Sequence, residues 1–287
     1  MSATNNDKKD KLYLDIDAVF KKKNPSAYRL TPKFLINYLK KIAHQDELNY
    51  MLSKYNNLYG LDFTDALVNY FEIKTTLKGT HNLPKDGRFI FASNHPIGGV
   101  DGVVFINVVG KLCGPSKTVV NDLLLNIENF NPLFVGVNKK GRATKHDLEQ
   151  LDKVYASNDH VLLFPAGLAS RRKKGVIEDL QWRRSFIIKA IEHERDIIPV
   201  HITGQLSNFF YNFANFRAFL GIKANLEMLY LADETFKQKK ESYTITFGKP
   251  ISYKVFDNSK ANEDWAQLVK EHVYKLKDNE DIDFKYD

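Results

Sequence analysis

The sequence is poor in cysteine and contains no long apolar run. Cys113 is its single cysteine, which excludes an intrachain disulfide framework and a cysteine-built zinc site, so we expect this side chain to pack as a small apolar group. No stretch approaches the ~18 to 20 apolar residues that a membrane-spanning helix needs. The first ten residues are polar and lack the apolar core of a signal peptide. These absences predict a soluble or peripheral protein in a reducing cytoplasm.

Positive charge and aromatic side chains are what the chain has in abundance. Lysine and arginine number 42 against 35 acidic residues, which gives a formal net charge of +7, and 20 Phe and 14 Tyr accompany them. This composition supports a sizeable core and indicates a partner of negative charge, either nucleic acid or an anionic membrane surface. The positive charge is spread out and no recognised nucleic-acid motif accompanies it, so no nucleic acid is expected as a partner.

Three regions follow one another along the chain. Residues 1–10 indicate a disordered polar tail, residues 11–75 a helical N-terminal region, and residues 76–287 an α/β domain. In the helical region, Thr31-Pro32 resembles a helix start, and apolar residues then recur at spacings of three and four. Two further helices are expected at Glu47–Tyr55 and Phe63–Phe71.

Beyond Gly79, short apolar runs alternate with helical stretches. This alternation is typical of an α/β fold with a central, largely parallel sheet flanked by helices. The expected strands are Arg88–Ser93, Thr118–Val120, Leu133–Val137, Val161–Phe164, Ile197–Ile202, Asn225–Leu231 and Tyr243–Phe247. The expected helices begin after Asp101 and cover Lys145–Tyr155, Trp182–His193 and Ala261–Lys277. Glu178 and Asp179 precede one of these helices, where carboxylates suit the helix dipole.

The segment Phe89–Gly102 combines a buried strand with a histidine and an aspartate. His95 lies where the strand would stop, and Asp101 follows six residues later in a loop that contains Gly98 and Gly99. The two glycines allow a turn tight enough for the aspartate to meet the histidine. An imidazole held by a carboxylate is what a general base needs to remove a proton from an alcohol.

Three later strand ends also have unusual loops. Ligands of open α/β sheets gather outside the carboxyl ends of the strands, so we expect these loops to share a site with His95. Four consecutive basic residues in one of them indicate an anionic ligand rather than a solvated loop. The three segments are Asn138–Arg142, Phe164–Lys174 and Ile197–His201.

These four segments, in this order, resemble the acyltransferases of the lysophosphatidic-acid and glycerol-3-phosphate type. The resemblance covers about residues 75–250. That family has a His-x4-Asp motif after a strand, a second block with Gly and Arg, a Phe-Pro-Glu-Gly-Thr-Arg-Ser third block and a Val-Pro fourth block. The resemblance implies that His95 is the general base for the acceptor hydroxyl and that Asp101 orients its ring. The hydroxyl would attack an acyl thioester directly, which agrees with the absence of a Gly-x-Ser-x-Gly elbow.

The resemblance also implies a set of substrate-binding residues, among which Arg171 and Arg172 would bind an acceptor anion by forked hydrogen bonds. Gly167 would allow close backbone approach. The set consists of Asn94, Gly98, Gly99, Lys139, Arg142, Pro165, Gly167, Ser170, Arg171 and Arg172. The co-substrate would be a thioester of acyl carrier protein or coenzyme A, with no other cofactor and no metal site.

Two departures from the family pattern narrow the expected acceptor. Five residues separate His95 from Asp101, one more than the family has, and Ala166 stands where the family has a glutamate that contacts the polar acceptor. The forms around His95 and in the third block look like a bacterial branch that esterifies the hydroxyl of N-(3-hydroxyacyl) amino acids. The expected acceptor is therefore a lyso-ornithine or lyso-glycine lipid. Lysophosphatidic acid is the alternative acceptor, and a non-catalytic lipid-binding or nucleic-acid-binding protein is the alternative of another class.

The segment 206–220 is dense in aromatic residues. As a helix it would either insert at a lipid interface, line an acyl tunnel or pack as a core helix. Together with the basic residues of the helical region, a lipid-facing helix would make a peripheral binder of an anionic membrane, on the inner face of the cytoplasmic membrane. Those basic residues are Lys21–Lys23, Lys33, Lys40 and Lys41.

Overall fold

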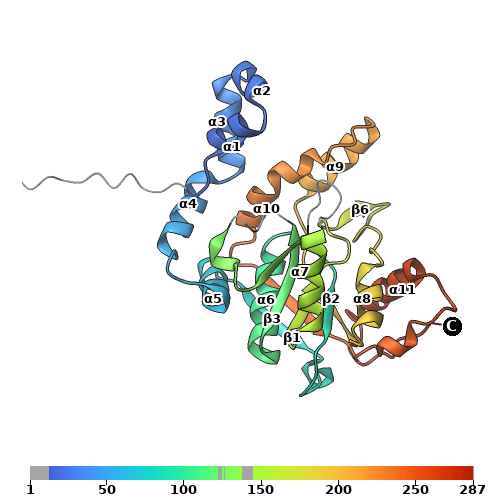
Figure 1. The fold of residues 1–287 in the computed structure, drawn as a ribbon. Coiled ribbons are helices and arrows are strands. Elements are labelled where there is room, and N and C mark those ends of the chain that lie inside the picture. The colour runs from blue at the N-terminus through green and yellow to red at the C-terminus, as the bar shows by residue number, and fades with distance from the viewer. Residues whose placement is uncertain (1–12, 122–124, 126, 138–144, 287) are drawn as a thin grey trace, which may run out of the picture.

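A seven-stranded sheet forms the centre of the fold (Figure 1). The computed structural model describes residues 13–121, 125, 127–137 and 145–286. The strand order is β1-β9-β8-β2-β5-β3-β4, and every neighbouring pair is parallel except β8 and β9. The strands are β1 (Lys74–Lys78), β2 (Ile90–Ser93), β3 (Ser116–Asn121), β4 (Phe134–Val137), β5 (His160–Leu163), β8 (Ile197–Ile202) and β9 (Ser242–Phe247). The predicted α/β class is confirmed.

Helices cover both faces of the sheet. Every residue of β2, β5 and β8 is buried, as expected for central strands of a sheet packed on two sides. The helices are α1 (Ile16–Lys23), α2 (Pro25–Leu30), α3 (Lys33–Ile42), α4 (Gln45–Lys54), α5 (Gly60–Tyr70), α6 (Val100–Cys113), α7 (Lys145–Ala156), α8 (Ser185–Glu192), α9 (Asn208–Phe219), α10 (Leu231–Lys237) and α11 (Asn262–Lys275). Short 3₁₀ helices lie at Thr80–Asn82, Glu128–Phe130, Leu226–Tyr230 (η4) and Tyr253–Val255.

Two apolar clusters follow from the alternation of side chains along the strands. Phe91 and Ile198 point to one face and join Phe63 of α5 and Phe105 of α6. The residues just before them in β2 and β8 point to the other face, where they meet α8 and α11 around Trp182, Phe186, Trp265 and Val269. The core therefore lies in two layers, with the sheet between them.

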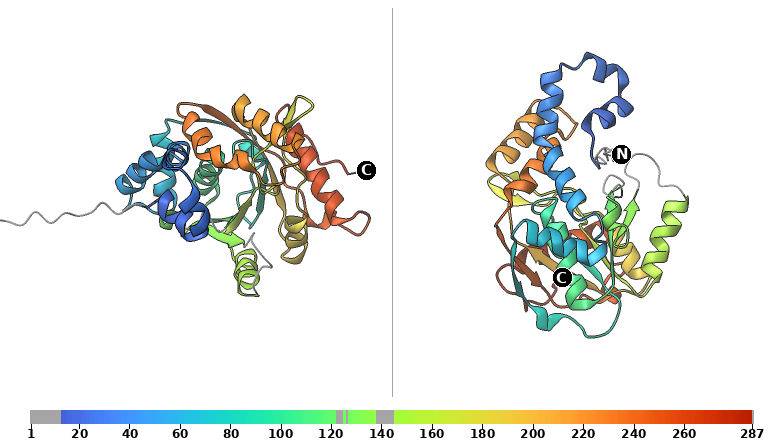
Figure 2. Two further views of the ribbon diagram at one scale, coloured as in Figure 1. Left: turned by 90° about the horizontal axis from the view of Figure 1, so that it is seen from above. Right: turned by 90° about the vertical axis from the view of Figure 1, so that its left-hand side faces the viewer.

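The N-terminal helices extend beyond the sheet as a projecting arm (Figures 1 and 2). The arm contacts the body through Tyr38 and His44. The Tyr38 hydroxyl lies 2.7 Å from the Tyr230 hydroxyl, and the His44 ring stacks on Phe236 with its Nε2 3.1 Å from Asp233. After α5, which packs against α6, the chain leads into β1. This strand completes one edge of the sheet, so it crosses the boundary that the sequence placed at residues 75 and 76.

Two segments differ from the sequence-based expectations. The strand predicted at Asn225–Leu231 is wrong: η4 and α10 occupy this region, and Glu227 turns inward to two arginines. The basic run after the third strand end is part of a hairpin, in which β6 (Arg171–Lys173) pairs antiparallel with β7 (Val176–Glu178). Lys174 and Gly175 form its two-residue turn with φ of 49° and 83°, as this kind of hairpin requires.

Among the described residues, the structure has no helix that is long and apolar enough to cross a membrane.

Candidate active site

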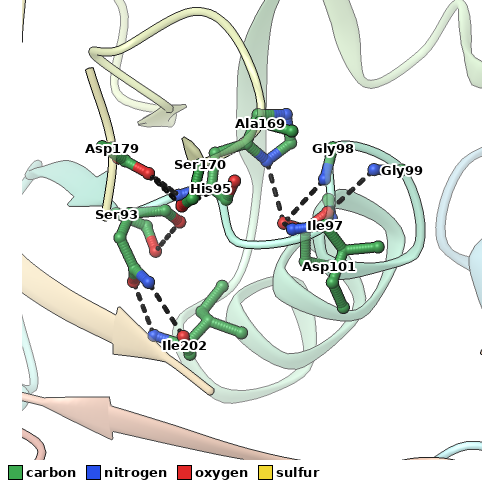
Figure 3. Close-up of polar contacts among 12 residues, drawn as sticks. Ser93, His95, Ile97, Gly98, Gly99, Asp101, Ala169, Ser170, Asp179 and Ile202 are labelled. Carbon is green, nitrogen blue, oxygen red and sulfur yellow. Dashed lines mark hydrogen bonds and ion pairs between the residues drawn. The ribbon is translucent and has the colours of Figure 1, made fainter. Parts of the chain in front are cut away.

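His95, in the loop between β2 and α6, meets Asp101 in the first turn of α6 (Figure 3). Nδ1 of His95 lies 2.9 Å from Oδ2 of Asp101, so the additional residue between them does not prevent the pair from forming. The Asp101 side chain is fully buried, whereas 15% of the His95 side chain is exposed. A carboxylate that accepts a hydrogen bond from Nδ1–H leaves the lone pair on Nε2, the nitrogen that can remove a proton.

Backbone amides surround the Asp101 carboxylate. It accepts hydrogen bonds from the N–H groups of Ile97, Gly98, Gly99 and Gly102 at 2.9 to 3.2 Å. Asp101 also lies in the first turn of α6, where the helix dipole favours negative charge. Burial opposes ionisation, but the bonds from His95 and the backbone outweigh it and hold the pKa of this carboxyl below its usual value. The loop thus builds a permanent negative charge beside the imidazole.

Gly98 and Gly99 bring this loop against its neighbours. Gly98 has a φ of +86°, and a Cβ at this position would lie 2.8 Å from Cβ of Ala169 in the third block. A Cβ at Gly99 would lie 2.5 Å from Oγ1 of Thr235 in α10. Both glycines are therefore required for close packing, which is the role that the sequence allows for them; neither donates a side chain to a ligand.

The Nε2 side of the His95 ring points away from Asp101, which contacts Nδ1. One face of its ring stacks on Phe164 with centroids 3.9 Å apart and an interplanar angle of 19°. Throughout the described part of the chain, no hydrogen bond reaches Nε2 of His95. The ring is thus held on one side by a carboxylate and on one face by an aromatic residue, with Nε2 free to meet a substrate hydroxyl. This is the arrangement of a general base.

The segment Phe164–Lys174, which matches the third block of the family, holds the backbone of His95. Ser170 donates its backbone N–H to the His95 carbonyl at 2.8 Å, and Pro165 accepts a hydrogen bond from the backbone N–H of Arg183. Gly167 adopts a φ of +66° at the turn after Phe164. Ala166 is buried in the apolar cluster around Trp182, so its side chain points into the core.

Other predicted site residues form structural contacts. Asn94 is buried and pairs with the backbone of Ile202 at the end of β8, donating to its carbonyl at 2.9 Å and accepting from its N–H at 2.7 Å. Arg172 lies at the side of α9, where its guanidinium donates to Asn208 and Asn212. Lys139 and Arg142 lie outside the described residues.

Arg171 is held inside the protein by a carboxylate that the sequence did not reveal. Its guanidinium lies 2.9 Å from Oε1 of Glu227, and Oε2 of the same glutamate lies 2.8 Å from Nε of Arg217. Arg171 also rests on the ring of Phe210 in α9. The two arginines of the third block therefore have different surroundings: Arg171 is buried, and Arg172 is partly exposed.

Asp179 is a second functional candidate, which the sequence pattern assigned only to a helix start. Its buried carboxylate accepts hydrogen bonds from the His95 backbone, the Ser170 hydroxyl and the Trp182 indole. The only signal in the sequence was an acidic residue in a segment followed by large apolar side chains. Such a signal does not reveal a partner 84 positions away.

His201, the last notable residue of the fourth strand end, lies within β8. It is buried, and its ring meets the edge of Tyr274 from α11. Burial lowers the pKa of His201 to about 4. Its surroundings are those of a neutral histidine in the core.

Known proteins resemble this chain in sequence over most of its length. A family model described as acyltransferase matches residues 18–283. The chain belongs to this acyltransferase family. It is 48% identical over 269 residues to a lyso-glycine lipid O-acyltransferase of Bacteroides thetaiotaomicron, covering 93% of this chain and 99% of that protein. A protein of the same name from Phocaeicola vulgatus is 44% identical, with 93% of this chain and 96% of the relative covered.

Among solved structures, the 1-acyl-sn-glycerophosphate acyltransferase of Thermotoga maritima aligns over 85% of this chain and 89% of its own, at a TM-score of 0.45 and 15% identity. The family model and the two sequence relatives make this chain an acyltransferase.

Proposed function

We propose that this acyltransferase transfers a fatty acyl group from an acyl thioester to the hydroxyl of a lyso-glycine lipid, with His95 as the general base. The observation that carries the reaction is the His95–Asp101 pair, whose Nε2 is free while Nδ1 is bound at 2.9 Å. The observation that favours the acceptor is the identity of 48% and 44% to two lyso-glycine lipid O-acyltransferases over 93% of the chain. Lyso-ornithine lipid, with the same reacting hydroxyl, is the second aminolipid in the proposal.

The reaction needs one proton relay. Nε2 of His95 takes the proton of the acceptor hydroxyl as its oxygen attacks the thioester carbonyl carbon, and a C–O bond forms. The tetrahedral intermediate collapses with cleavage of the C–S bond, and the leaving thiolate takes the proton from the imidazolium. Asp101 keeps Nδ1 protonated and stabilises the imidazolium between these steps, since its carboxylate is buried and charged.

The acceptor of the proposed reaction carries one carboxylate, for which Arg172 is the better placed of the two arginines. Arg171 already pairs with Glu227, whereas Arg172 is partly exposed and, in the described structure, contacts two neutral amides and the ring of Tyr211. A guanidinium with neutral partners can exchange them for a carboxylate without breaking an ion pair. Gly167 and Ser170, at the base of the same hairpin, would border the acceptor.

A lipid surface on the arm and on α9 fits this substrate. Exposed apolar side chains gather on α2, α3 and the end of α9, including Phe34 with 74% and Phe219 with 86% of its surface exposed. Lys33 and Lys41 are exposed on the same arm. In Figure 1 the arm, α9 and β6 all lie in the upper half of the view. We name this the lipid-facing surface; apolar insertion and attraction to anionic lipid together give stable peripheral binding.

An acceptor panel tests the proposed function. Purified enzyme is given one acyl thioester, first on acyl carrier protein and then on coenzyme A, with lyso-glycine lipid, lyso-ornithine lipid and lysophosphatidic acid in separate reactions. We expect the highest kcat/KM with lyso-glycine lipid. A preference for lysophosphatidic acid would overturn the acceptor assignment, and the two donor arms identify the co-substrate.

The variant His95→Ala tests the general base in the same assay. Removing a general base lowers kcat by about 10²- to 10⁴-fold. The matched control is His81→Ala, since His81 is 62% exposed and pairs with Asp281 at the surface. Full turnover by His95→Ala would exclude His95 as the base.

Vesicle binding tests the lipid-facing surface. Phe219→Ser is expected to weaken binding to vesicles of mixed anionic and neutral phospholipid by about tenfold, because a buried Phe contributes roughly 1.5–3 kcal/mol. Leu112→Ser, at an exposed position near the end of α6, is the control and should bind as the unchanged enzyme does. If both variants bind vesicles equally, α9 does not belong to the lipid-facing surface.

A further inference from the structure

Both backbone polar groups of His95 are held by the hairpin of the third block. The His95 carbonyl accepts from the Ser170 N–H at 2.8 Å, and its own N–H donates to the Asp179 carboxylate at 3.1 Å to Oδ1 and 3.3 Å to Oδ2 (Figure 3). β2 ends at Ser93, so the sheet no longer pairs the backbone at this point. His95 is therefore fixed from two sides, at its ring by Asp101 and at its main chain by Asp179.

The Asp179 carboxylate has an unusual set of partners. It is 3% exposed, and besides the His95 N–H it accepts hydrogen bonds from Oγ of Ser170 at 2.6 Å and Nε1 of Trp182 at 2.9 Å. All three donors are neutral groups. Burial raises the pKa of this carboxyl, and the hydrogen bonds from Ser170 and Trp182 act against that rise. A buried carboxylate supported only by neutral donors is costly, so a functional reason for its place beneath His95 is expected.

The C-terminal helix fixes Asp179 in turn. The Asp179 N–H donates to the Tyr274 hydroxyl at 2.7 Å, and its carbonyl accepts from Nζ of Lys270 at 2.7 Å. Both side chains come from α11, which packs in the apolar cluster on one face of the sheet. A rigid chain of contacts thus runs from α11 through Asp179 to the backbone of His95.

We propose that Asp179 is a positioning residue of the general base. It holds the His95 backbone in the position from which Nε2 can reach the acceptor hydroxyl. Its negative charge also stabilises the imidazolium that forms as the proton leaves the hydroxyl. This inference rests on the proposed role of His95. Asp101 and Asp179 then divide the work: one orients the ring, and the other fixes the main chain from which the ring projects.

The substitution Asp179→Asn removes the charge of this side chain while keeping its size and shape nearly unchanged. An amide NH₂ in place of Oδ1 can donate to Oγ of Ser170, whose hydroxyl can turn toward the His95 carbonyl, 3.3 Å away. The remaining amide oxygen, in place of Oδ2, still accepts from Trp182 and from the His95 N–H. We therefore expect the fold to be kept while the charge is lost. We expect kcat to fall about tenfold with KM within about twofold, and Asp179→Ala, which also loses the position, to lower kcat about 100-fold.

Two controls make the test specific to His95. Asp152→Asn removes a carboxylate on the exposed part of α7 and is expected to keep full kcat. In the background of His95→Ala, Asp179→Asn should lower the residual rate no further, because residues that act as one unit are not additive. A further loss in that background would show that Asp179 acts by some other route and would overturn the inference.

Failure of the inference is distinguishable from failure of the proposed function. If His95→Ala is inactive while Asp179→Asn keeps full kcat, the general base stands and the positioning role falls; a raised KM at unchanged kcat would also overturn the positioning role. If Asp179→Asn does not fold, Trp182→Phe decides, since it removes one donor to Asp179 without touching His95. A two- to fivefold loss of kcat is then expected, roughly the effect of one weakened hydrogen bond, and an unchanged kcat would overturn the role.

Discussion

Glu227 lies 2.9 Å from the guanidinium of Arg171 in an ion pair that water scarcely reaches, with 0% and 9% of the two side chains exposed. Nε of Arg217 lies 2.8 Å from the other oxygen of the same carboxylate, and a second nitrogen of Arg217 donates to Oε1 at 3.3 Å. Glu227 therefore neutralises part of the charge of both Arg171 and Arg217. The strand β6, which begins at Arg171, is anchored by this cluster.

Glu227→Gln should destabilise the protein strongly. The variant leaves two guanidinium groups close together without their carboxylate, and breaking a buried ion pair in this way costs about 3–5 kcal/mol of unfolding free energy. Urea-induced unfolding measures the loss. Glu263→Gln is the matched control, since Glu263 pairs with Arg184 at the surface and such pairs contribute up to ~1 kcal/mol. Equal losses in the two variants would mean that the buried cluster adds no more stability than a surface ion pair.

Asp101→Asn should lower activity more than it changes substrate binding. The amide NH₂ of the variant must face either His95 or the backbone N–H groups that now donate to the carboxylate, so the ring loses its fixed tautomer. We expect kcat to fall by about 10²- to 10⁴-fold with a much smaller change of KM. Steady-state kinetics with Asp281→Asn as control measure this; that carboxylate is exposed. A kcat within about threefold of the unchanged enzyme would refute the role.

Gly98→Ala should impair the loop by a clash as well as by backbone strain. Position 98 has a φ of +86°, and the new Cβ would lie 2.8 Å from Cβ of Ala169. The strain alone costs about 1–3 kcal/mol. Gly175→Ala has nearly the same φ, +83°, with nothing within 4 Å of its Cβ, so it reports strain without a clash. Thermal unfolding and kcat of both variants are compared. We expect the larger loss at position 98, with reduced kcat there alone; identical effects would show that Ala169 does not constrain the loop.

The sequence predicted the parts of this fold that depend on local patterns. Continuous apolar runs identified β2 and β8, and the Gly98-Gly99 pair made the His95–Asp101 contact plausible in spite of the extra residue. The sequence did not predict β1, because four of its five residues are polar or charged, as an edge strand permits. Such a strand shows little periodicity to detect.

Partners far apart in sequence could not be predicted. Asp179 reaches His95 across 84 positions, and Glu227 reaches Arg171 across 56. A lone acidic residue in a sequence indicates a solvated or capping group, because only the folded chain shows which donors surround it. The strand expected at Asn225–Leu231 was wrong for the same reason: the segment's apolar residues suggested a strand, but burial of Glu227 with two arginines favours a compact helical turn.

Two buried histidines should make stability depend on pH below neutrality. Burial lowers the pKa of both His201 and His272 to about 4, and nearby lysines add to this. The unfolded chain binds a proton at each near its ordinary value of 6.5, whereas the folded chain does not. Stability from these groups is therefore complete above about pH 6.5 and is lost as the pH falls toward 4.

Each histidine should remove roughly 2–3 kcal/mol of unfolding free energy between pH 7 and pH 4.5. Urea unfolding at several pH values measures the slope of the unfolding free energy against pH. Near pH 5, one proton changes this slope by about 1.4 kcal/mol per pH unit. His201→Gln and His272→Gln should each flatten the curve by about one such proton, whatever uniform loss of stability follows from removing a buried ring. His81→Gln, at an exposed position, should leave the slope unchanged. Curves parallel to that of the unchanged protein in both core variants would mean that these histidines do not control its acid stability.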